Sequence, residues 1–326
     1  MTYKHLCDIT EPKLSVITTS LNHGRFLRET IESVANQSYS NFEHIVIDGG
    51  SSDETLDILR QYPHIRWISE VDGSPFEAFL KGLSMARGDY IIQCCVSDGF
   101  LDKHWFQKCV SLLDKDIETS LVWGLAQDMS EGGDLLSVTN SEFFNDPPPQ
   151  KQAFLALWLA NGIVLPEGNF CVRSEVIKRC FPNEKSESFF QIHPILGFMY
   201  QFMLQGYCPY FLRMIANFGR IHQDQRSQLF FDIEKPAVEM YFKSLKDFRK
   251  RLFSGKTRHY FRNARSEVIG ELSPKDLLPL RMKIWRHKIF RSSLFRLDPY
   301  TLVLKIRIRI KGNRNVRGHI SPEDLG

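Results

Sequence analysis

The stretch KLSVITTSLNHGRFLRETIESVANQSYSNFEHIVID, residues 13–48, carries the pattern that decides the fold. Residues 13–20 and 42–48 are short, apolar and rich in β-branched side chains, which is typical of buried strands. Between them, residues 25–37 repeat apolar side chains at the spacing of one helix face. A strand, a helix and a second strand in this order predict parallel strands joined by a right-handed crossover.

The same alternation continues along the amino-terminal half. Further strands are predicted at 65–70 and 89–96, with helices at 53–62 and 75–86 before them. Repeated in this way, the pattern predicts an α/β fold, in which a mainly parallel central sheet has helices on both faces.

Beyond this half the predicted elements follow no regular alternation, and a change to basic composition separates the last part of the chain from the rest. Strands are predicted at 121–128, 135–139 and 168–174, and helices at 152–160 and 194–207. After residue 228 the pattern changes to basic helices dotted with aromatic residues. We therefore predict a domain at 12–235 and a basic, mostly helical C-terminal extension at 236–326.

Polar side chains follow each of the four predicted parallel strands. They are Thr18, Thr19 and Ser20, then Asp48, then Glu70 and Asp72, then Ser97 and Asp98. In open parallel sheets, ligands bind beyond the carboxyl ends of the strands. The sequence therefore predicts a binding site at this edge of the sheet.

Composition limits the classes of protein to which the chain can belong. Of the 326 residues 43% are hydrophobic and 25% charged, which is ordinary for a soluble globular protein. The seven cysteines form no CxxC pair, and their odd number disfavours a disulfide framework. Residues 1–13 lack the pattern of a secretory signal, and the most apolar stretch, 153–166, is too short to span a bilayer. A cytoplasmic location is expected.

The C-terminal part is strongly basic. Residues 243–317 hold 22 Lys and Arg against 5 Asp and Glu. Within a predicted helix at 280–297, Ile284 and Trp285 are expected on one apolar side, flanked by cations. This is how a helix lies on an anionic membrane surface, here the inner face of the membrane. Packing against the preceding domain or a partner is the alternative. Nucleic acid is unlikely as a partner because no nucleic-acid-binding motif accompanies the charge.

Common phosphate-binding loops are absent from the sequence. It contains no GxxxxGK[ST] motif, and no GxGxxG motif follows the first strand. The paired glycines of DGGSSDET, residues 48–55, fit a tight turn before a helix, and Ser51 and Glu54 have capping-box spacing.

Several motifs together resemble those of family-2 glycosyltransferases with the GT-A fold. They are SVITTSLN (15–22), IDGGSSDET (47–55), KGLSMARGDYI (81–91) and SDGF (97–100), followed by RIHQDQRS (220–227), which is similar to the family's Arg-x-His element. The resemblance covers residues 12–228. It implies a nucleotide-diphosphate sugar donor and transfer of the sugar to a hydroxyl group of a glycan or lipid-linked acceptor, usually with inversion.

The resemblance also implies roles for individual residues. Thr19 and Asn22 would lie near the nucleotide, and Asp48 would bind the base. Asp98 would lie near the diphosphate and its Mg²⁺ or Mn²⁺, and His222 would approach the same group from a closing loop. A divalent cation stabilises the charge of a departing diphosphate and prefers carboxylate ligands.

Plainer structural roles are open for the same residues. Asp48 can hold its Gly-Gly turn, and Asp98 can cap the helix predicted after it. Ser97 is a candidate binding residue because it follows the fourth predicted strand. Lys81 can bind the diphosphate, or it can form a solvated pair with Glu77, four residues earlier.

The chain departs from the family pattern at three places. Leu21 stands where the family commonly has an aromatic residue that stacks on the base. Gly99 stands where a second aspartate usually ligates the metal. The helix that begins near Pro194 lacks the acidic residue expected at its start to serve as the base.

These departures leave two hypotheses. In the first, the chain is an active transferase, and His193, Glu167 or Glu187 accepts the proton of the acceptor hydroxyl. In the alternative, it is a catalytically impaired, glycosyltransferase-like binding or regulatory protein. A histidine before a proline at a helix start also fits a cap or a packed surface group.

Overall fold

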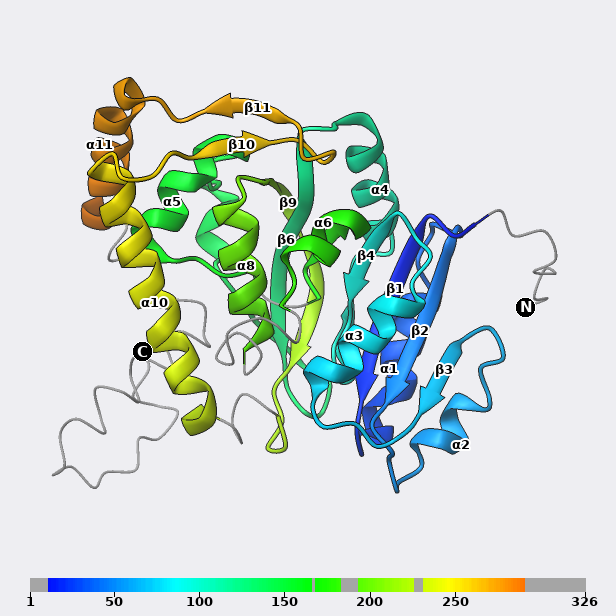
Figure 1. The fold of residues 1–326 in the computed structure, drawn as a ribbon. Helices are drawn as coiled ribbons and strands as arrows, with labels where there is room; N and C mark the ends of the chain where they lie inside the picture. The colour runs from blue at the N-terminus through cyan, green and yellow to red at the C-terminus, as the bar shows by residue number, and fades with distance from the viewer. Residues whose placement is uncertain (1–10, 166–167, 183–192, 226–230, 291–326) are drawn as a thin grey trace, which may run out of the picture.

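The computed structural model describes residues 11–165, 168–182, 193–225 and 231–290 (Figure 1). The main sheet contains β1 (Leu14–Ser20), β2 (Phe42–Asp48), β3 (Arg66–Ser69), β4 (Tyr90–Gln93), β5 (Gly99–Phe100), β6 (Thr119–Met129), β7 (Leu135–Val138), β8 (Phe170–Arg173) and β9 (Cys208–Arg220). A separate hairpin contains β10 (Tyr260–Arg262) and β11 (Val268–Glu271). The helices are α1 (Gly24–Ala35), α2 (Thr55–Leu59), α3 (Pro75–Met85), α4 (Trp105–Lys115), α5 (Phe154–Asn161), α6 (Ser174–Cys180), α8 (Pro194–Leu204), α10 (Phe231–Phe253) and α11 (Pro274–Phe290).

The order of strands brings six carboxyl ends to one edge of the sheet. The order is β3-β2-β1-β4-β8-β6-β9-β5, with β7 attached to β6. Strands β1 to β4 are mutually parallel, β8 is antiparallel to both β4 and β6, and β6 is parallel to β9. Strands β6 and β9 therefore point the same way as β1 to β4. This confirms the predicted α/β architecture with a mainly parallel sheet.

Helices bury both faces of this sheet. One hydrophobic cluster joins β1, β2 and β4 to α3, α6 and α8, and a second joins the other face of β1 and β4 to α1 and α4. Helix α3 packs so close to the sheet that a Cβ atom at Gly82 would overlap the Ile17 side chain. Strands that are buried on both faces read as continuous apolar runs, which explains why they were visible in the sequence.

The described part of the basic C-terminal region packs on the domain that precedes it. The Trp158 indole of α5 donates a hydrogen bond to the buried Tyr241 hydroxyl of α10 at 2.8 Å, and Phe248 packs 6.0 Å from the same indole. The boundary predicted near residue 236 lies within α10. The division into two domains stays a prediction.

Helix α11 turns Ile284 and Trp285 in different directions. Ile284 and Leu280 are buried in the main core, whereas the Trp285 side chain is 62% exposed. Neighbouring residues of a helix lie about 100° apart, so burial of one turns the next away from the core. The predicted shared face of these two residues is therefore not formed. Within the described ranges, no helix combines the length and apolar character needed to cross a membrane.

Candidate active site

Asp48, at the end of β2, holds the loop that follows it. Its buried carboxylate accepts hydrogen bonds from the N–H groups of Gly50 at 3.2 Å and Ser51 at 2.9 Å, and from the Ser69 hydroxyl at 2.7 Å. The Ser51 hydroxyl donates a hydrogen bond to the other carboxylate oxygen of Asp48. The plainer role of Asp48, holding the turn, is thus present in the structure, and a contact with a base stays a prediction.

The loop after β1 is joined to the loop after β2. Asn22 adopts a left-handed conformation with φ 53°, and its side-chain oxygen accepts the Ser52 N–H at 2.8 Å. Its own N–H donates to the Ser51 hydroxyl at 2.7 Å. Thr19 is half-buried just before this loop, and its carbonyl accepts the Val96 N–H at 3.3 Å. Thr19 and Asn22 therefore lie where the β1, β2 and β4 ends meet.

Asp72 lies in the same region, although it was not singled out as a site residue. A Cβ atom built at Gly49 would lie 3.3 Å from the Asp72 carboxylate oxygens and 3.4 Å from Leu21 Cδ1. Burial raises the pKa of the Asp72 carboxyl, and nearby Glu77 adds to this shift while Lys81 opposes it. Its position after the third predicted strand was the available signal.

Lys81 points to Glu70 rather than forming a simple pair with Glu77. Its ammonium lies 2.8 Å from a Glu70 carboxylate oxygen, and this hydrogen bond raises the pKa of Lys81. Glu77 instead accepts the Gly73 N–H at 2.8 Å. The cation is therefore close to the β3 end, and binding of a diphosphate would require Lys81 to exchange Glu70 for the ligand.

Asp98 is fixed by a residue distant in the sequence. One of its carboxylate oxygens accepts the backbone N–H of Arg220 at 3.0 Å, and its carbonyl accepts the Thr30 hydroxyl at 2.7 Å. It does not cap α4, which begins at Trp105, because His104 occupies the N-cap position. His104 makes no side-chain capping bond, and Asp102 accepts the His104 N–H at 2.7 Å in the turn before the helix. The capping role considered for Asp98 is therefore not observed.

Ser97 has a strained backbone next to this aspartate. It is buried, and its φ of 83° lies in the left-handed region, which a residue with a side chain seldom adopts. Such strain costs about 1–3 kcal/mol and is concentrated at functional sites. The Ser97 carbonyl is held by Arg220 Nε at 3.3 Å, so the surrounding structure maintains the conformation.

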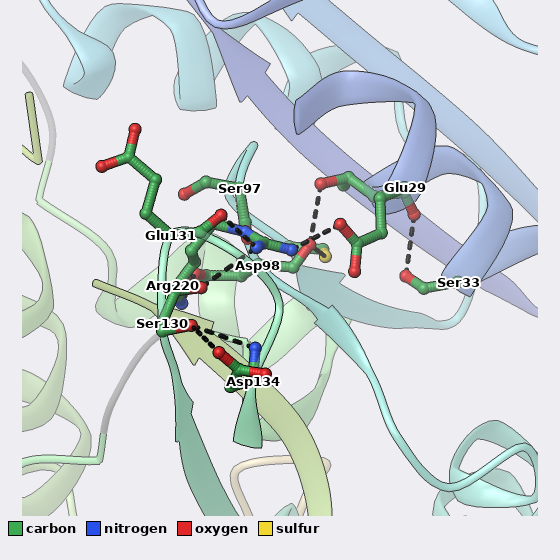
Figure 2. A network of polar contacts seen from close by, with 10 residues as sticks. Glu29, Ser33, Ser97, Asp98, Ser130, Glu131, Asp134 and Arg220 are labelled. Atoms are coloured by element: carbon green, nitrogen blue, oxygen red, sulfur yellow. Dashed lines mark hydrogen bonds and ion pairs between the residues drawn. The ribbon is translucent and has the colours of Figure 1, made fainter. Parts of the chain in front are cut away.

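Arg220, at the end of β9, connects the segments that follow β4 and β6 to the middle of α1, as Figure 2 shows. Its buried guanidinium donates to the Ser97 carbonyl, to the carbonyls of Ser130 at 3.2 Å and Glu131 at 3.1 Å, and to the Glu29 carboxylate of α1. The guanidinium carbon also lies 5.0 Å from the centre of the Phe26 ring. Sequence reasoning identified Arg220 only as part of the Arg-x-His element. Its positioning role depends on these long-range contacts.

His222 is buried beside the same part of α1. Its ring centroid lies 5.2 Å from that of His23 and 5.0 Å from that of Phe26. Its Nδ1 atom is buried and has no hydrogen-bond partner among the residues that the structure describes. Burial, His23 and Arg25 lower the pKa of His222, so the ring is neutral near pH 7. A neutral imidazole can bind a metal ion or accept a hydrogen bond.

The described residues supply only part of a metal site. Among them, no cluster of three or more His, Cys, Asp or Glu side chains is placed to hold a metal ion. Gly99 cannot be replaced by a second carboxylate without movement, because a Cβ atom there would lie 2.7 Å from the Phe218 ring and from Ser33 Oγ. Asp98 supplies the carboxylate oxygen that Mg²⁺ and Mn²⁺ prefer, and the buried Nδ1 atom of His222 is an imidazole nitrogen without a partner among the described residues. Two such side chains leave most of the coordination of a divalent cation to oxygen atoms of the nucleotide sugar and to water.

The catalytic base is not located by the described residues. His193 is half-buried at the N-cap position of α8, and Pro194 follows it. The first turn of α8 contains no acidic residue, as expected from the sequence. Glu167 and Glu187 lie outside the described residues. The assignment of a base to His193 or Glu167 stays a prediction.

Comparison with known proteins supports the resemblance seen in the motifs. The family model described as glycosyl transferase family 2 matches residues 15–178. An uncharacterized glycosyltransferase of Mycobacterium tuberculosis is 35% identical over 126 residues, which are 38% of this chain and 48% of that protein. Chondroitin synthase of Escherichia coli is 28% identical over 130 residues, which are 39% of this chain and 19% of that protein. The similarity thus spans about half the length of the mycobacterial protein and 19% of the length of the chondroitin synthase.

Two solved structures share the fold at low sequence identity. S. aureus TarS 1-349 in complex with UDP-GlcNAc has a TM-score of 0.52 and 13% identity, covering 90% of this chain and 79% of that one. The mannosyltransferase of Pyrobaculum calidifontis, in complex with GDP-Man and Mn²⁺, has a TM-score of 0.51 and 12% identity, covering 94% and 82%. Because the family model matches half of the sequence and the fold agrees over most of it, this chain belongs to glycosyltransferase family 2.

Proposed function

We propose that this chain transfers a sugar from a nucleotide-diphosphate sugar to a hydroxyl group of a glycan or lipid-linked acceptor, with inversion at the anomeric carbon. The observation that carries the proposal is the convergence of polar residues at the carboxyl edge, where Arg220 holds the Ser97–Asp98 segment. Family membership and structural neighbours that bind UDP-GlcNAc and GDP-Man support a nucleotide-sugar donor.

The nucleotide would occupy the ends of β1, β2 and β3. Asn22 and Thr19 would border it, and Asp72 would hydrogen-bond the base from above Gly49. Asp48 would act indirectly by holding the loop, because several donors of the chain already contact its carboxylate. We therefore propose Asp72, rather than Asp48 as the motif resemblance implies, as the residue that contacts the base.

The diphosphate would lie near Asp98, with Lys81 as a nearby cation. Asp98 and His222, with donor oxygens, would hold Mg²⁺ or Mn²⁺, which when bound would stabilise negative charge on the leaving diphosphate. Arg220 keeps Asp98 in place through its backbone N–H. His193 or Glu167 would accept the proton of the acceptor hydroxyl.

Helix α11 supports a peripheral position on an anionic membrane at its cytoplasmic face. Leu278, Met282 and Trp285 follow helical spacing and are 66%, 64% and 62% exposed. Exposed Arg281 and Lys283 lie on the same helix. An exposed apolar stripe with flanking cations fits the headgroup layer of an anionic bilayer. A lipid-linked acceptor would be presented at this surface.

The test of activity compares Asp98→Asn with Asp89→Asn. Asp89 is an exposed carboxylate paired with Lys13, at the opposite end of β4, so its variant is a matched control. We expect nucleoside-diphosphate release from UDP- or GDP-sugars with Mn²⁺, and a loss of about 100-fold or more in kcat/KM only for Asp98→Asn. Turnover unaffected by Asp98→Asn contradicts the assignment. Calorimetric binding of a donor without turnover by the unaltered chain supports the impaired binding protein instead.

The membrane contact is tested by sedimentation with phosphatidylglycerol vesicles. Serine substitution of Leu278, Met282 and Trp285 is expected to abolish pelleting, whereas serine at the exposed Leu135 and Leu136 of β7 is not. Equal pelleting of the two variants contradicts this orientation of α11. Pelleting with oligonucleotides but not with vesicles would identify nucleic acid as the anionic partner.

A further inference from the structure

A concave site lies at the end of the main sheet opposite to the candidate active site. It has a volume of about 420 Å³, and its wall includes Arg179, Tyr207, Arg258, Arg262 and Ser266. Tyr207 directly precedes β9, and the 13 residues of β9 run from there to Arg220 in the candidate active site. At about 3.3 Å per residue, the two sites are roughly 40 Å apart. Figure 1 shows the β10–β11 hairpin at the top, away from the carboxyl ends of β1 to β3.

Close backbone packing fixes the wall of this pocket. Gly206 has a φ of 83°, and a Cβ atom there would overlap the Tyr260 carbonyl oxygen, so a side chain cannot be accommodated. The Arg262 N–H donates to the Gly206 carbonyl at 2.9 Å. The hairpin is thereby held against the end of α8, and Arg262 of β10 lines the same pocket as Arg258, which precedes β10, and Arg179 of α6.

The pocket gathers cationic donors that carboxylates neutralise only weakly. Arg179 donates to the Ser266 and Tyr207 hydroxyls, and Arg262 donates to the Ser266 carbonyl at 3.1 Å. Arg179 lies 3.7 Å from a Glu175 carboxylate. The side chains of this pair are 44% and 74% exposed, and such pairs contribute little.

The other two arginines are even less neutralised. Arg258 is 3.5 Å from Glu271, and the Arg258 side chain is 74% exposed. Within the described part of the chain, no carboxylate forms an ion pair with Arg262. Three guanidinium groups therefore face one concave surface with an excess of positive charge.

We propose that this pocket binds a phosphate monoester or inorganic phosphate. Guanidinium groups present parallel N–H donors that match two oxygens of a phosphate, and hydroxyl groups can supply further hydrogen bonds. Tyr207 Oη and Ser266 Oγ form a hydrogen bond of 2.7 Å, so one of these two hydroxyl groups keeps a proton that it can donate to the bound anion. The site is separate from the proposed sugar transfer, and neither function requires the other.

The first experiment is calorimetric titration of the full chain with inorganic phosphate at low ionic strength. We expect saturable binding that weakens about tenfold in Arg262→Gln and in Arg258→Gln. Arg265→Gln is the matched control, because Arg265 is exposed and does not line the pocket. Glu271→Gln is expected to tighten binding, since it removes the carboxylate that competes for Arg258. Binding should be unchanged in Asp98→Asn, which separates this site from the donor site.

The source of the phosphate group is decided by a second arm. Vesicles with phosphatidic acid carry a phosphate monoester, whereas phosphatidylglycerol vesicles carry only a diester. Binding to phosphatidic acid vesicles that depends on Arg262 identifies a lipid headgroup as the ligand. Binding of inorganic phosphate without binding to phosphatidic acid vesicles identifies a free anion. Absence of saturable phosphate binding, or equal weakening in Arg262→Gln and Arg265→Gln, overturns the proposal. Because Arg258 is exposed, Arg258→Gln keeps the test valid if Arg262→Gln does not fold.

Discussion

Replacement of Arg220 by lysine should loosen the candidate active site while keeping the positive charge. The guanidinium contacts three backbone carbonyls and the Glu29 carboxylate. Nη1 makes both contacts to Ser130 and Glu131, so a lysine ammonium placed there can retain these two. It cannot also reach the Ser97 carbonyl, which is now bound by Nε at 3.3 Å.

The magnitude follows from the contacts that are lost. A buried carbonyl left without a donor costs about 1–3 kcal/mol, and that applies to Ser97. The Glu29 side chain is 52% exposed, so loss of its ion pair costs about 1 kcal/mol or less. Arg220→Lys should therefore lower the free energy of unfolding by about 1–4 kcal/mol. Glu29→Gln, the control, should cost about 1 kcal/mol at most.

Two measurements on the same variants decide between a positioning role and a merely structural one. Urea unfolding followed by tryptophan fluorescence gives the change in stability. Steady-state kinetics under conditions where Arg220→Lys is fully folded should show kcat/KM lowered by at least about tenfold, because Ser97 loses its side-chain anchor beside Asp98, although the backbone N–H that holds Asp98 remains. A loss of stability below about 1 kcal/mol, or a normal kcat/KM in the folded variant, would refute the reasoning.

Three other predictions follow from single residues. Gly99→Asp should destabilise the fold by about 1–3 kcal/mol without creating a metal ligand, because the new Cβ atom would lie 2.7 Å from the Phe218 ring. Urea unfolding measures the destabilisation, and a stable variant that binds Mn²⁺ more tightly would contradict the prediction. Burial lowers the pKa of His44 to about 3, so the unfolded chain, but not the folded one, takes up a proton as the pH falls below about 6.5. Stability should thus fall by about 2 kcal/mol between pH 8 and pH 5 from this group, and the urea midpoint of His44→Gln should depend less steeply on pH than that of the unaltered chain. Asp72→Asn should raise the KM for the nucleotide sugar about tenfold with little change in kcat, and an unchanged KM would remove Asp72 from the nucleotide site.

The amino-terminal half of the fold could be predicted from sequence because its signals are local. The strands expected at 13–20 and 42–48 are found at Leu14–Ser20 and Phe42–Asp48. The long strand β9 was missed, since Cys208–Arg220 includes Pro209 and Gly219 and lacks clear alternation. Its extended conformation is stabilised by pairing with β6 and β5, which lie far away in the sequence. Such pairing overrides local propensity.

The candidate site divides in the same way. The sequence by itself determined that polar residues follow successive strands, because strand direction and hydrophobic pattern are local properties of the chain. Only the tertiary structure decided that Asp98 is anchored by the backbone N–H of Arg220, and that His104 rather than Asp98 occupies the N-cap position of α4. It also decided that a side chain at Gly99 would meet Phe218. These outcomes depend on where β9 returns beside β5 and β6, and that position is set by packing of the whole sheet rather than by any short stretch of residues.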